Sequence, residues 1–307
     1  MQRGAPLLAT LLLAACSVER GAGPFPDRDG WPSDAVATSD AGLIDGGVAP
    51  LTRPEGTWML FTEDRKCLYA AGDPVENLIW SWYVVDVVRP DAGSALLRQS
   101  VRLCHQELSP LSFGFITLVP DIIPDNLDPV TVAAFLVGPD PGEAYVSDEM
   151  VSYWGVTGIG PDEPLPTSVD DPRVFDLEDD GHPGVTLPVT TTSGMELCQV
   201  YAVQRIRQRL RGVVVNNQRV DGTFSATTDK EVIDATTALC ASGALINSQA
   251  ESHFSMVRID GLDGSPDLDD NRDGEVDCDE FRDAIVATMQ AYGLARSAPE
   301  SVENCPQ

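Results

Sequence analysis

Residues 78–88 read Leu-Ile-Trp-Ser-Trp-Tyr-Val-Val-Asp-Val-Val, and this stretch decides the fold class. Aromatic and β-branched side chains dominate it, and such residues are enriched in β-strands. Pro90 and the Asp-Ala-Gly triplet at positions 91–93 follow, and clusters of this kind end strands. The stretch therefore predicts a strand that is followed by a tight connection.

Further segments of the same kind lie along the chain, and residues 130–137 fit either a helix or a buried strand. The fold class that they predict is mainly β, an antiparallel barrel or sandwich of about eight strands or more with one or two short helices. We place this β domain at residues 57–260. Apolar runs between Pro-, Gly- and Asp-rich turns predict further strands at residues 58–61, 96–104, 113–119, 144–146, 151–156, 197–210 and 254–259, with bends at Gly212 and Gly222.

One helix is predicted inside the β domain, at residues 228–239. Thr228 and Glu231 have the spacing of a capping box, in which a hydroxyl and a carboxylate each accept a hydrogen bond from a backbone N–H at the helix start. Apolar residues then recur with helical spacing, which gives the helix one face for burial. These residues are Val232, Ile233, Ala235, Thr236 and Leu239.

The composition excludes one class of partner. The chain has 307 residues, with 20 Lys and Arg against 48 Asp and Glu, so its formal net charge is −28. Binding to nucleic acid requires an excess of basic residues to neutralise phosphates, so we expect no nucleic-acid partner. An acidic surface attracts cations instead.

The N-terminus indicates export. Arg3 precedes an apolar run at residues 7–13 that is too short to span a bilayer. Leu13-Ala14-Ala15-Cys16 then resembles the bacterial lipobox, in which the cysteine receives a diacylglyceryl group and becomes the mature N-terminus. The alternative is an ordinary secretory signal that contains a cysteine.

The lipobox resemblance implies a signal peptide at residues 1–15 and a membrane anchor at Cys16. Ser17 is not the aspartate of an inner-membrane retention signal, so the resemblance favours the outer membrane or the cell surface. Residues 16–56 are rich in Gly, Pro, Asp, Ser and Ala without apolar periodicity, and this composition predicts a disordered tether.

The cysteine count agrees with export. If Cys16 is acylated, six cysteines remain, and an even number in an exported chain suggests disulfide bonds. Six cysteines allow 15 pairings. Our hypothesis is that nearest neighbours pair, as Cys67–Cys104, Cys198–Cys240 and Cys278–Cys305.

Residues 269–280, Asp-Asp-Asn-Arg-Asp-Gly-Glu-Val-Asp-Cys-Asp-Glu, have the spacing of a twelve-residue calcium loop. This segment, the 269–280 loop, resembles the EF-hand loop, with Gly274 at the sharp turn and Val276 as its apolar anchor. Side-chain oxygens and one backbone carbonyl, that of Glu275, would hold Ca²⁺. The predicted ligands are Asp269, Asn271, Asp273, Glu275, Asp277 and Glu280.

The resemblance covers the loop and the helix after it, within a C-terminal segment at residues 261–307. Gly261, Gly264 and Pro266 make an entering helix improbable. Dockerins also lack that helix, but they carry two such loops, so we do not favour cohesin binding. The helix after the loop is predicted from an apolar stripe that packs on the β domain and ends at Gly293. The stripe consists of Phe281, Ile285, Met289 and Tyr292.

A second acidic segment, residues 176–184 (the 176–184 loop), begins like a calcium loop. Asp176, Glu178 and Asp180 supply oxygens at positions 1, 3 and 5, with a glycine at position 6, but Leu187 occupies position 12. It is similar to the short Asp-rich calcium turns of exported β proteins. An ordinary Asp/Gly turn is the alternative.

Alternating arginines at positions 205, 207, 209 and 211 share one strand face. They fit either an anionic ligand or cross-strand pairing with acidic residues, and we favour pairing. His105, His182 and His253 are the chain's histidines, and none lies in a metalloprotease motif or a nucleophile elbow.

Taken whole, the chain resembles exported bacterial lipoproteins that combine a β domain with an Asp-rich calcium loop, and this resemblance implies no activity. Our leading hypothesis is a calcium-binding surface lipoprotein whose β domain serves binding or envelope structure, and we favour a non-enzymatic role over catalysis. A secreted hydrolase that uses two carboxylates, with a structural calcium, is the first alternative. A calycin-like barrel that carries a small apolar ligand is the second.

Overall fold

The computed structural model describes residues 49–70, 73–111, 114–238, 240–241, 245–248 and 252–298. The predicted signal peptide, Cys16 and Cys305 lie outside these residues, as does most of the predicted tether. In the described part, twelve strands belong to one antiparallel sheet. They are β1 (Gly56–Ala70), β2 (Asp73–Val88), β3 (Leu96–Leu108), β4 (Phe115–Thr117), β5 (Val130–Leu136), β6 (Ala144–Ser147), β7 (Met150–Trp154), β8 (Val185–Thr191), β9 (Glu196–Asn216), β10 (Arg219–Ala235), β11 (Leu245–Ser248) and β12 (Ser252–Arg258).

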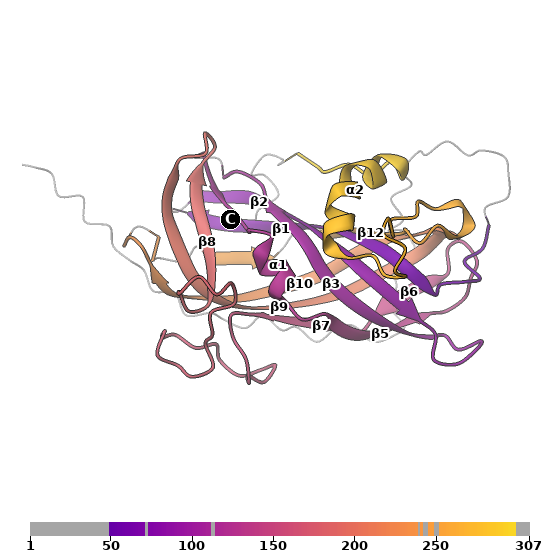
Figure 1. Cartoon of the computed structure of the whole chain (residues 1–307), viewed down its shortest axis with the longest axis horizontal. Helices are drawn as coiled ribbons and strands as arrows, with labels where there is room; N and C mark the ends of the chain where they lie inside the picture. The colour runs from indigo at the N-terminus through magenta and orange to yellow at the C-terminus, as the bar shows by residue number, and fades with distance from the viewer. Residues whose placement is uncertain are drawn as a thin grey trace, which may run out of the picture. The chain divides into compact units, whose positions relative to one another are not determined.

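The strand pairings close into a ring, which makes the sheet a barrel. Its order is β10-β12-β1-β2-β3-β5-β6-β9, and β9 pairs in turn with β10 along almost its whole length. β7 continues β6 along the same edge of β9, while β8 and β4 extend the sheet beyond it (Figure 1). The prediction of a mainly β, antiparallel fold is confirmed.

Residues 78–88 read as a nearly continuous apolar run because both faces of β2 are buried. Tyr83 and Val85 point into the core inside the barrel. Trp80, Trp82 and Val84 belong to a second core on the outer face. A strand that is covered on both sides loses the alternation of apolar and polar residues that a half-exposed strand shows.

The second core exists because the C-terminal helix α2 (Cys278–Ala291) lies on the outside of the barrel (Figure 1). Phe281, Ile285 and Met289 pack there against Met59 and the tryptophans of β2. The predicted apolar stripe and the role of Gly293 at the helix end (φ 62°) are confirmed. The structure also has a short α1 (Ile122–Asn126) and a 3-10 turn η1 (Leu262–Gly264).

The predicted helix at residues 228–239 is wrong, because this segment continues β10 as far as Ala235. Thr228 pairs with Ile206 and Val232 with Ala202 of β9, so the neighbouring strand satisfies the backbone groups that the capping box would have served. The β-branched residues that give the segment its apolar face also suit a strand. Residues 130–137, left open between helix and strand, form β5.

Two of the three predicted disulfides are wrong. Cys198–Cys240 is confirmed, but Cys104 of β3 pairs with Cys278 at the start of α2, with 5.0 Å between their Cα atoms. This bond excludes both Cys67–Cys104 and Cys278–Cys305. Pairing by nearness in sequence fails here because α2 returns to the barrel 174 residues after β3.

Candidate metal centre

The 269–280 loop makes a tight turn before α2. Arg272 and Gly274 both have left-handed backbone conformations, with φ angles of 62° and 93°. Gly274 adopts such a φ without the steric cost that a Cβ would bring. In the described residues the only helical turn just before the loop is the three-residue η1, so the predicted absence of an entering helix is confirmed.

Backbone N–H groups orient the first three predicted side-chain ligands. Asp269 accepts hydrogen bonds from the N–H groups of Asp273 (3.1 Å) and Gly274 (2.9 Å). Asn271 Oδ1 accepts from the Asp273 N–H at 2.8 Å, and Asp273 Oδ1 accepts from the Glu275 N–H at 3.0 Å. These bonds turn the three side chains toward the inside of the turn.

Glu280 ties the two ends of the loop together. Its Oε1 accepts a hydrogen bond from the Asn271 N–H (3.0 Å), and its Oε2 accepts from the Asp277 N–H (3.2 Å). Asp277 Oδ1 accepts in return from the Glu280 N–H at 2.8 Å, so these two residues form a capping box at the start of α2. Glu280, the last predicted ligand, thus lies against the backbone of Asn271, the second.

The barrel holds this loop at two points. Val276 and Phe281 are buried in the outer core, as expected for the apolar anchors of the loop and the helix. The Cys104–Cys278 disulfide joins loop position 10 to β3, and Arg282 donates a hydrogen bond to the Cys104 carbonyl oxygen at 3.0 Å. The loop is therefore attached to a rigid strand as well as to its own helix.

The donor chemistry of the loop suits Ca²⁺, which takes six to eight oxygen ligands from carboxylates, amide carbonyls and water. Among the described residues, no three His, Cys, Asp or Glu side chains are placed to hold one metal ion together. In the 269–280 loop the carboxylates contact backbone N–H groups instead. Besides these carboxylates, the loop offers two neutral oxygens of the kinds that bind calcium, the side-chain amide oxygen of Asn271 and the backbone carbonyl oxygen of Glu275.

The 176–184 loop repeats the geometry of the 269–280 loop. Asp176 accepts from the N–H groups four and five residues later, those of Asp180 (3.2 Å) and Gly181 (2.7 Å), as Asp269 does. Asp180 Oδ1 accepts from the His182 N–H at 2.9 Å, as Asp273 does from Glu275. Left-handed residues fall at the same two positions, Asp179 (φ 57°) and Gly181 (φ 90°). The two loops therefore share the hydrogen bonds of positions 1 and 5 and the left-handed residues at positions 4 and 6.

The two loops differ in how they end. Leu187, at position 12 of the second loop, is buried in the core of the barrel, where it cannot act as a ligand. Glu178, at position 3, has its Oε1 hydrogen-bonded to the Thr186 N–H at 2.8 Å. Burial, together with the charges of Asp180 and Asp176, raises the pKa of Glu178 to about 7.

Two arginines of the β9 stripe, Arg205 and Arg207, lie against the loop at residues 160–163. Arg205 is 6% exposed and donates two hydrogen bonds to Asp229 of β10, at 2.9 and 2.6 Å, and others to the carbonyls of Gly160 and Glu163. Arg207 also pairs with Asp229, at 3.2 Å. Both arginines thus make the cross-strand pairing that we favoured, and their donors are used by the protein itself.

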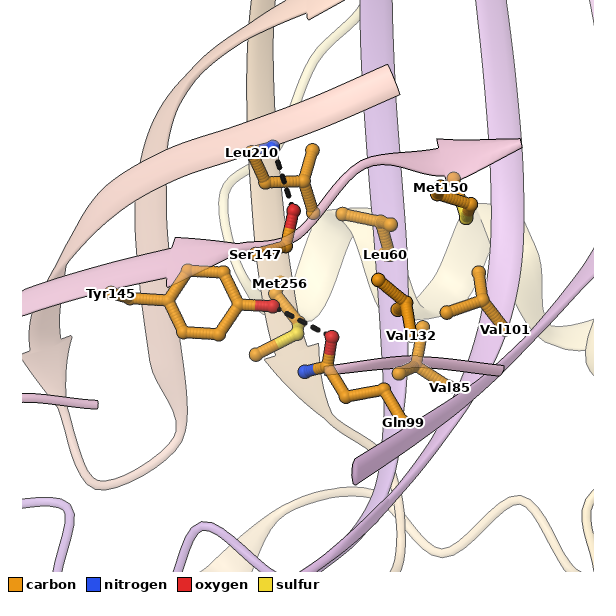
Figure 2. Close-up of a pocket in the computed structure, with 10 residues that line it drawn as sticks. All are labelled: Leu60, Val85, Gln99, Val101, Val132, Tyr145, Ser147, Met150, Leu210 and Met256. Atoms are coloured by element: carbon orange, nitrogen blue, oxygen red, sulfur yellow. Dashed lines mark hydrogen bonds between the residues drawn. The ribbon is translucent and has the colours of Figure 1, made fainter. Parts of the chain in front are cut away.

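The interior of the barrel is filled by side chains. The hollow of Figure 2, about 10 Å³, is lined by Leu60, Val85 and their neighbours, with Tyr145 donating a hydrogen bond to Gln99 across it (2.9 Å). A second hollow beside Trp154 measures about 30 Å³, and Asp128 is the one carboxylate that lines it. Each has room for a water molecule or two, whereas small-molecule sites span about 300–1,000 Å³.

Two charged clusters were not predicted from the sequence. Asp64 and Lys66 form an ion pair inside the barrel (2.8 Å), and Lys66 is only 1% exposed. The sequence did offer a signal for this ion pair: residues two apart on a strand lie on one face, where opposite charges can pair. On the outside, His105 lies between Asp121 and Glu107, with no pattern in the sequence to bring Asp121 there.

The described residues form an antiparallel barrel with an acidic loop before a helix that is attached to its outer face. Comparison of the chain with protein-family models, with curated proteins and with solved structures found no match. In the described part of the chain, no helix has both the length and the apolar character needed to cross a membrane.

Proposed function

We propose that this protein is a calcium-binding bacterial surface lipoprotein, anchored through Cys16 at the outer membrane or cell surface, whose barrel is a structural or binding body. The anchor rests on the lipobox resemblance at residues 13–16, outside the described residues. The calcium site rests on the 269–280 loop, with Asp269, Asn271, Asp273, Asp277 and Glu280 as side-chain ligands and Glu275 as a carbonyl ligand.

The observation that carries the calcium site is the position of Glu280. In a twelve-residue calcium loop the last residue closes the shell with two oxygens, so it must reach back to the beginning of the loop. Here both Glu280 oxygens accept hydrogen bonds from loop N–H groups, and one of these belongs to Asn271. The residue that must close the shell is thus already folded over the loop.

We propose a structural rather than a signalling role for this ion. Sensor EF-hands respond to calcium by changing the angle between two helices. In the described residues this loop has only the exit helix α2, which is held to β3 by the Cys104–Cys278 disulfide and by Phe281 in the outer core. Calcium binding would then order the loop and stabilise the attachment of α2, without a swing of helices.

The described cavities do not favour the alternative functions. A carrier of an apolar ligand needs a volume that hollows of about 10 and 30 Å³ do not supply. A carboxylate-type hydrolase needs two carboxyl groups about 5–9 Å apart at one cleft. The larger hollow is lined by one carboxylate, that of Asp128, and the smaller by none.

The test is a pair of melting and titration experiments on three variants. We expect calcium to raise the melting temperature of the wild type, with a Kd of about 10⁻⁴–10⁻³ M. At a hundredfold excess over Kd the gain is about 2.7 kcal/mol. Asp269→Ala and Glu280→Gln remove ligands, so they should abolish the calcium-dependent stabilisation that comes from the 269–280 loop. Asp270→Asn removes the same negative charge from an exposed position that is not a ligand, so it should keep that stabilisation.

Two results would contradict the proposal. One is a calcium-dependent gain in Asp269→Ala and Glu280→Gln that equals that of the wild type. The other is an equal loss in Asp270→Asn, which would show that only the general charge of the loop matters. Gln at position 280 can still accept the capping-box hydrogen bond at the start of α2. If Glu280→Gln does not bind calcium, unfolding of the first turn of α2 is therefore not the cause.

A further inference from the structure

Two buried oxygen atoms beside the 176–184 loop have no hydrogen-bond partner. They are Oε2 of Glu178 and Oγ1 of Thr186. Thr186 is only 9% exposed, and its backbone N–H donates to the other oxygen of Glu178 at 2.8 Å. Buried polar atoms without a partner are rare, and each calls for a bound water, an ion or strain as its explanation.

The Thr186 hydroxyl faces the loop. Its neighbours in β8, Val185 and Leu187, belong to the core inside the barrel, so Thr186 points to the opposite, outer face. Its cross-strand partner Tyr201 is stacked on His182 of the loop, with 4.3 Å between ring centroids. The loop therefore covers this outer face, and the hydroxyl lies beneath it together with Glu178.

Negative charge at this place lacks a counterion. In the described residues no lysine or arginine forms an ion pair with Asp176, Glu178 or Asp180. Within the same part of the chain, the buried Oε2 of Glu178 has no hydrogen-bond donor within reach to offset its charge either. Three carboxylates in one short loop repel one another, and a bound cation would offset the free-energy cost of this repulsion.

We propose that the 176–184 loop and Thr186 form a second site for a divalent cation, Ca²⁺, with Asp176, Glu178, Asp180 and the Thr186 hydroxyl as ligands. All four offer hard oxygen donors, which calcium prefers. The carboxylates do not yet converge, so the ion draws them inward. In a twelve-residue calcium loop the carboxylate at position 12 completes the coordination shell. Here position 12 is Leu187, and the Thr186 hydroxyl and the buried oxygen of Glu178 take over that role.

This site is independent of the 269–280 loop, so the two can be counted separately. The experiment measures calcium stoichiometry by calorimetry on the full chain, with calcium as the only added metal. We expect two ions on the wild type and one on the Asp269→Ala/Glu280→Gln double variant. Glu178→Gln should also bind one ion, and Thr186→Val should bind the second ion about tenfold more weakly or worse.

The variants are chosen so that folding is preserved. Glu178→Gln keeps an oxygen for the Thr186 N–H, and Thr186→Val replaces an unpartnered hydroxyl with a methyl group of the same shape. Melting without calcium should therefore change little in either. Asp179→Asn is the matched control: it removes one charge from the exposed left-handed position of the same loop, a position that Asn also tolerates, and should still bind two ions.

Each remaining outcome decides the matter. If the Asp269→Ala/Glu280→Gln variant binds no ion, or if Glu178→Gln binds as many as the wild type, the second site is refuted. If the wild type binds one ion that Glu178→Gln loses and the double variant keeps, the second site stands and the proposed C-terminal site fails. A wild type that binds no calcium refutes both.

Discussion

His105 lies on the outer face of the barrel between two carboxylates. Its Nδ1 is 2.6 Å from Asp121 Oδ1, and its Nε2 is 3.1 Å from Glu107 Oε1. The hydrogen bond to Glu107, followed by the bond to Asp121 and the charges of both, raises the pKa of His105 above its ordinary value near 6.5. The protonated ring donates to both carboxylates, which a neutral ring cannot do.

We predict that this cluster makes stability depend on pH. Because the folded-state pKa is raised, its contribution is fully present below the unfolded pKa and is lost as pH rises through the folded pKa. The free energy of unfolding of the wild type, relative to His105→Gln, should therefore be larger at pH 5.5 than at pH 8.5. We expect a difference of about 1 kcal/mol or less, because the cluster is partly exposed.

Denaturant unfolding of both proteins across this pH range, with an NMR titration of the ring, measures the effect. Glu107→Gln serves as a partner variant, since it should lower the pKa of His105 by removing the largest cause of its shift. An advantage of the wild type that grows as pH rises would show that the sign of the linkage is wrong.

At the scale of elements, the Cys104–Cys278 disulfide is the covalent link between α2 and the barrel. It joins residues 174 positions apart, and the Cys198–Cys240 bond joins residues 42 apart. By the chain-entropy estimate, removing them costs about 5 and about 4 kcal/mol. We predict that Cys104→Ala/Cys278→Ala destabilises the protein more than Cys198→Ala/Cys240→Ala.

The two disulfide variants also separate stability from calcium binding. Cys278 is position 10 of the 269–280 loop, whereas the other disulfide lies elsewhere in the barrel. Loss of the Cys104–Cys278 bond should therefore lower the calcium affinity of that loop, and loss of the Cys198–Cys240 bond should not. Equal effects of both variants on a calorimetric calcium titration would show that the disulfide does not support the loop.

Sequence patterns predicted elements well where the signal is local. Most of the strands and α2 follow from apolar runs and from a stripe that neighbouring residues define. The prediction failed at residues 228–239, where the capping spacing is local but the strand partner β9 is not. Two of the three predicted disulfides failed for a similar reason, since the bond between α2 and β3 spans 174 residues. Long-range packing overrides local propensity in both cases.

The candidate sites were predictable to the same degree. The spacing of Asp and Gly residues predicted the tight turns of the 269–280 loop and of the first half of the 176–184 loop, because these turns are made by residues adjacent in sequence. Calcium binding by either loop stays a prediction. The contribution of Thr186 was not predictable, since it depends on β8 turning that residue outward beneath the loop. Nor did alternation alone show that Arg205 is covered by the carbonyls of Gly160 and Glu163.

At the scale of the whole molecule, the pairing of β9 with β10 closes the barrel. Gly212 and Gly222 face each other there, and a Cβ on Gly222 would collide with the backbone of Arg211 and Gly212. The ring of Phe254 lies over Gly212, in the space that a larger side chain would occupy. These glycines thus mark a close approach of two strands, which only residues without a side chain permit. Both strands run on through them, and the predicted bends stay a prediction.

The proposed membrane location of the whole molecule depends on a lipid at Cys16, and this anchor gives our last prediction. One acyl chain holds a protein on a membrane only marginally, whereas two or more hold it stably. A diacylglyceryl group on Cys16 should therefore place the wild type in the membrane fraction, and a fatty-acid probe should label it. Cys16→Ala should lose both the label and the membrane association.

A second variant tests the membrane that is reached, separately from the anchor itself. Ser17→Asp creates the aspartate that resembles the inner-membrane retention signal, so it should keep the fatty-acid label but move the protein from the outer to the inner membrane fraction. Labelling of Cys16→Ala at the level of the wild type would refute the anchor. If the labelled wild type already fractionates with the inner membrane, the lipid anchor stands but the proposed surface location is refuted. The two can fail separately because the lipid provides the affinity for a bilayer, whereas the residue after it determines which membrane is reached.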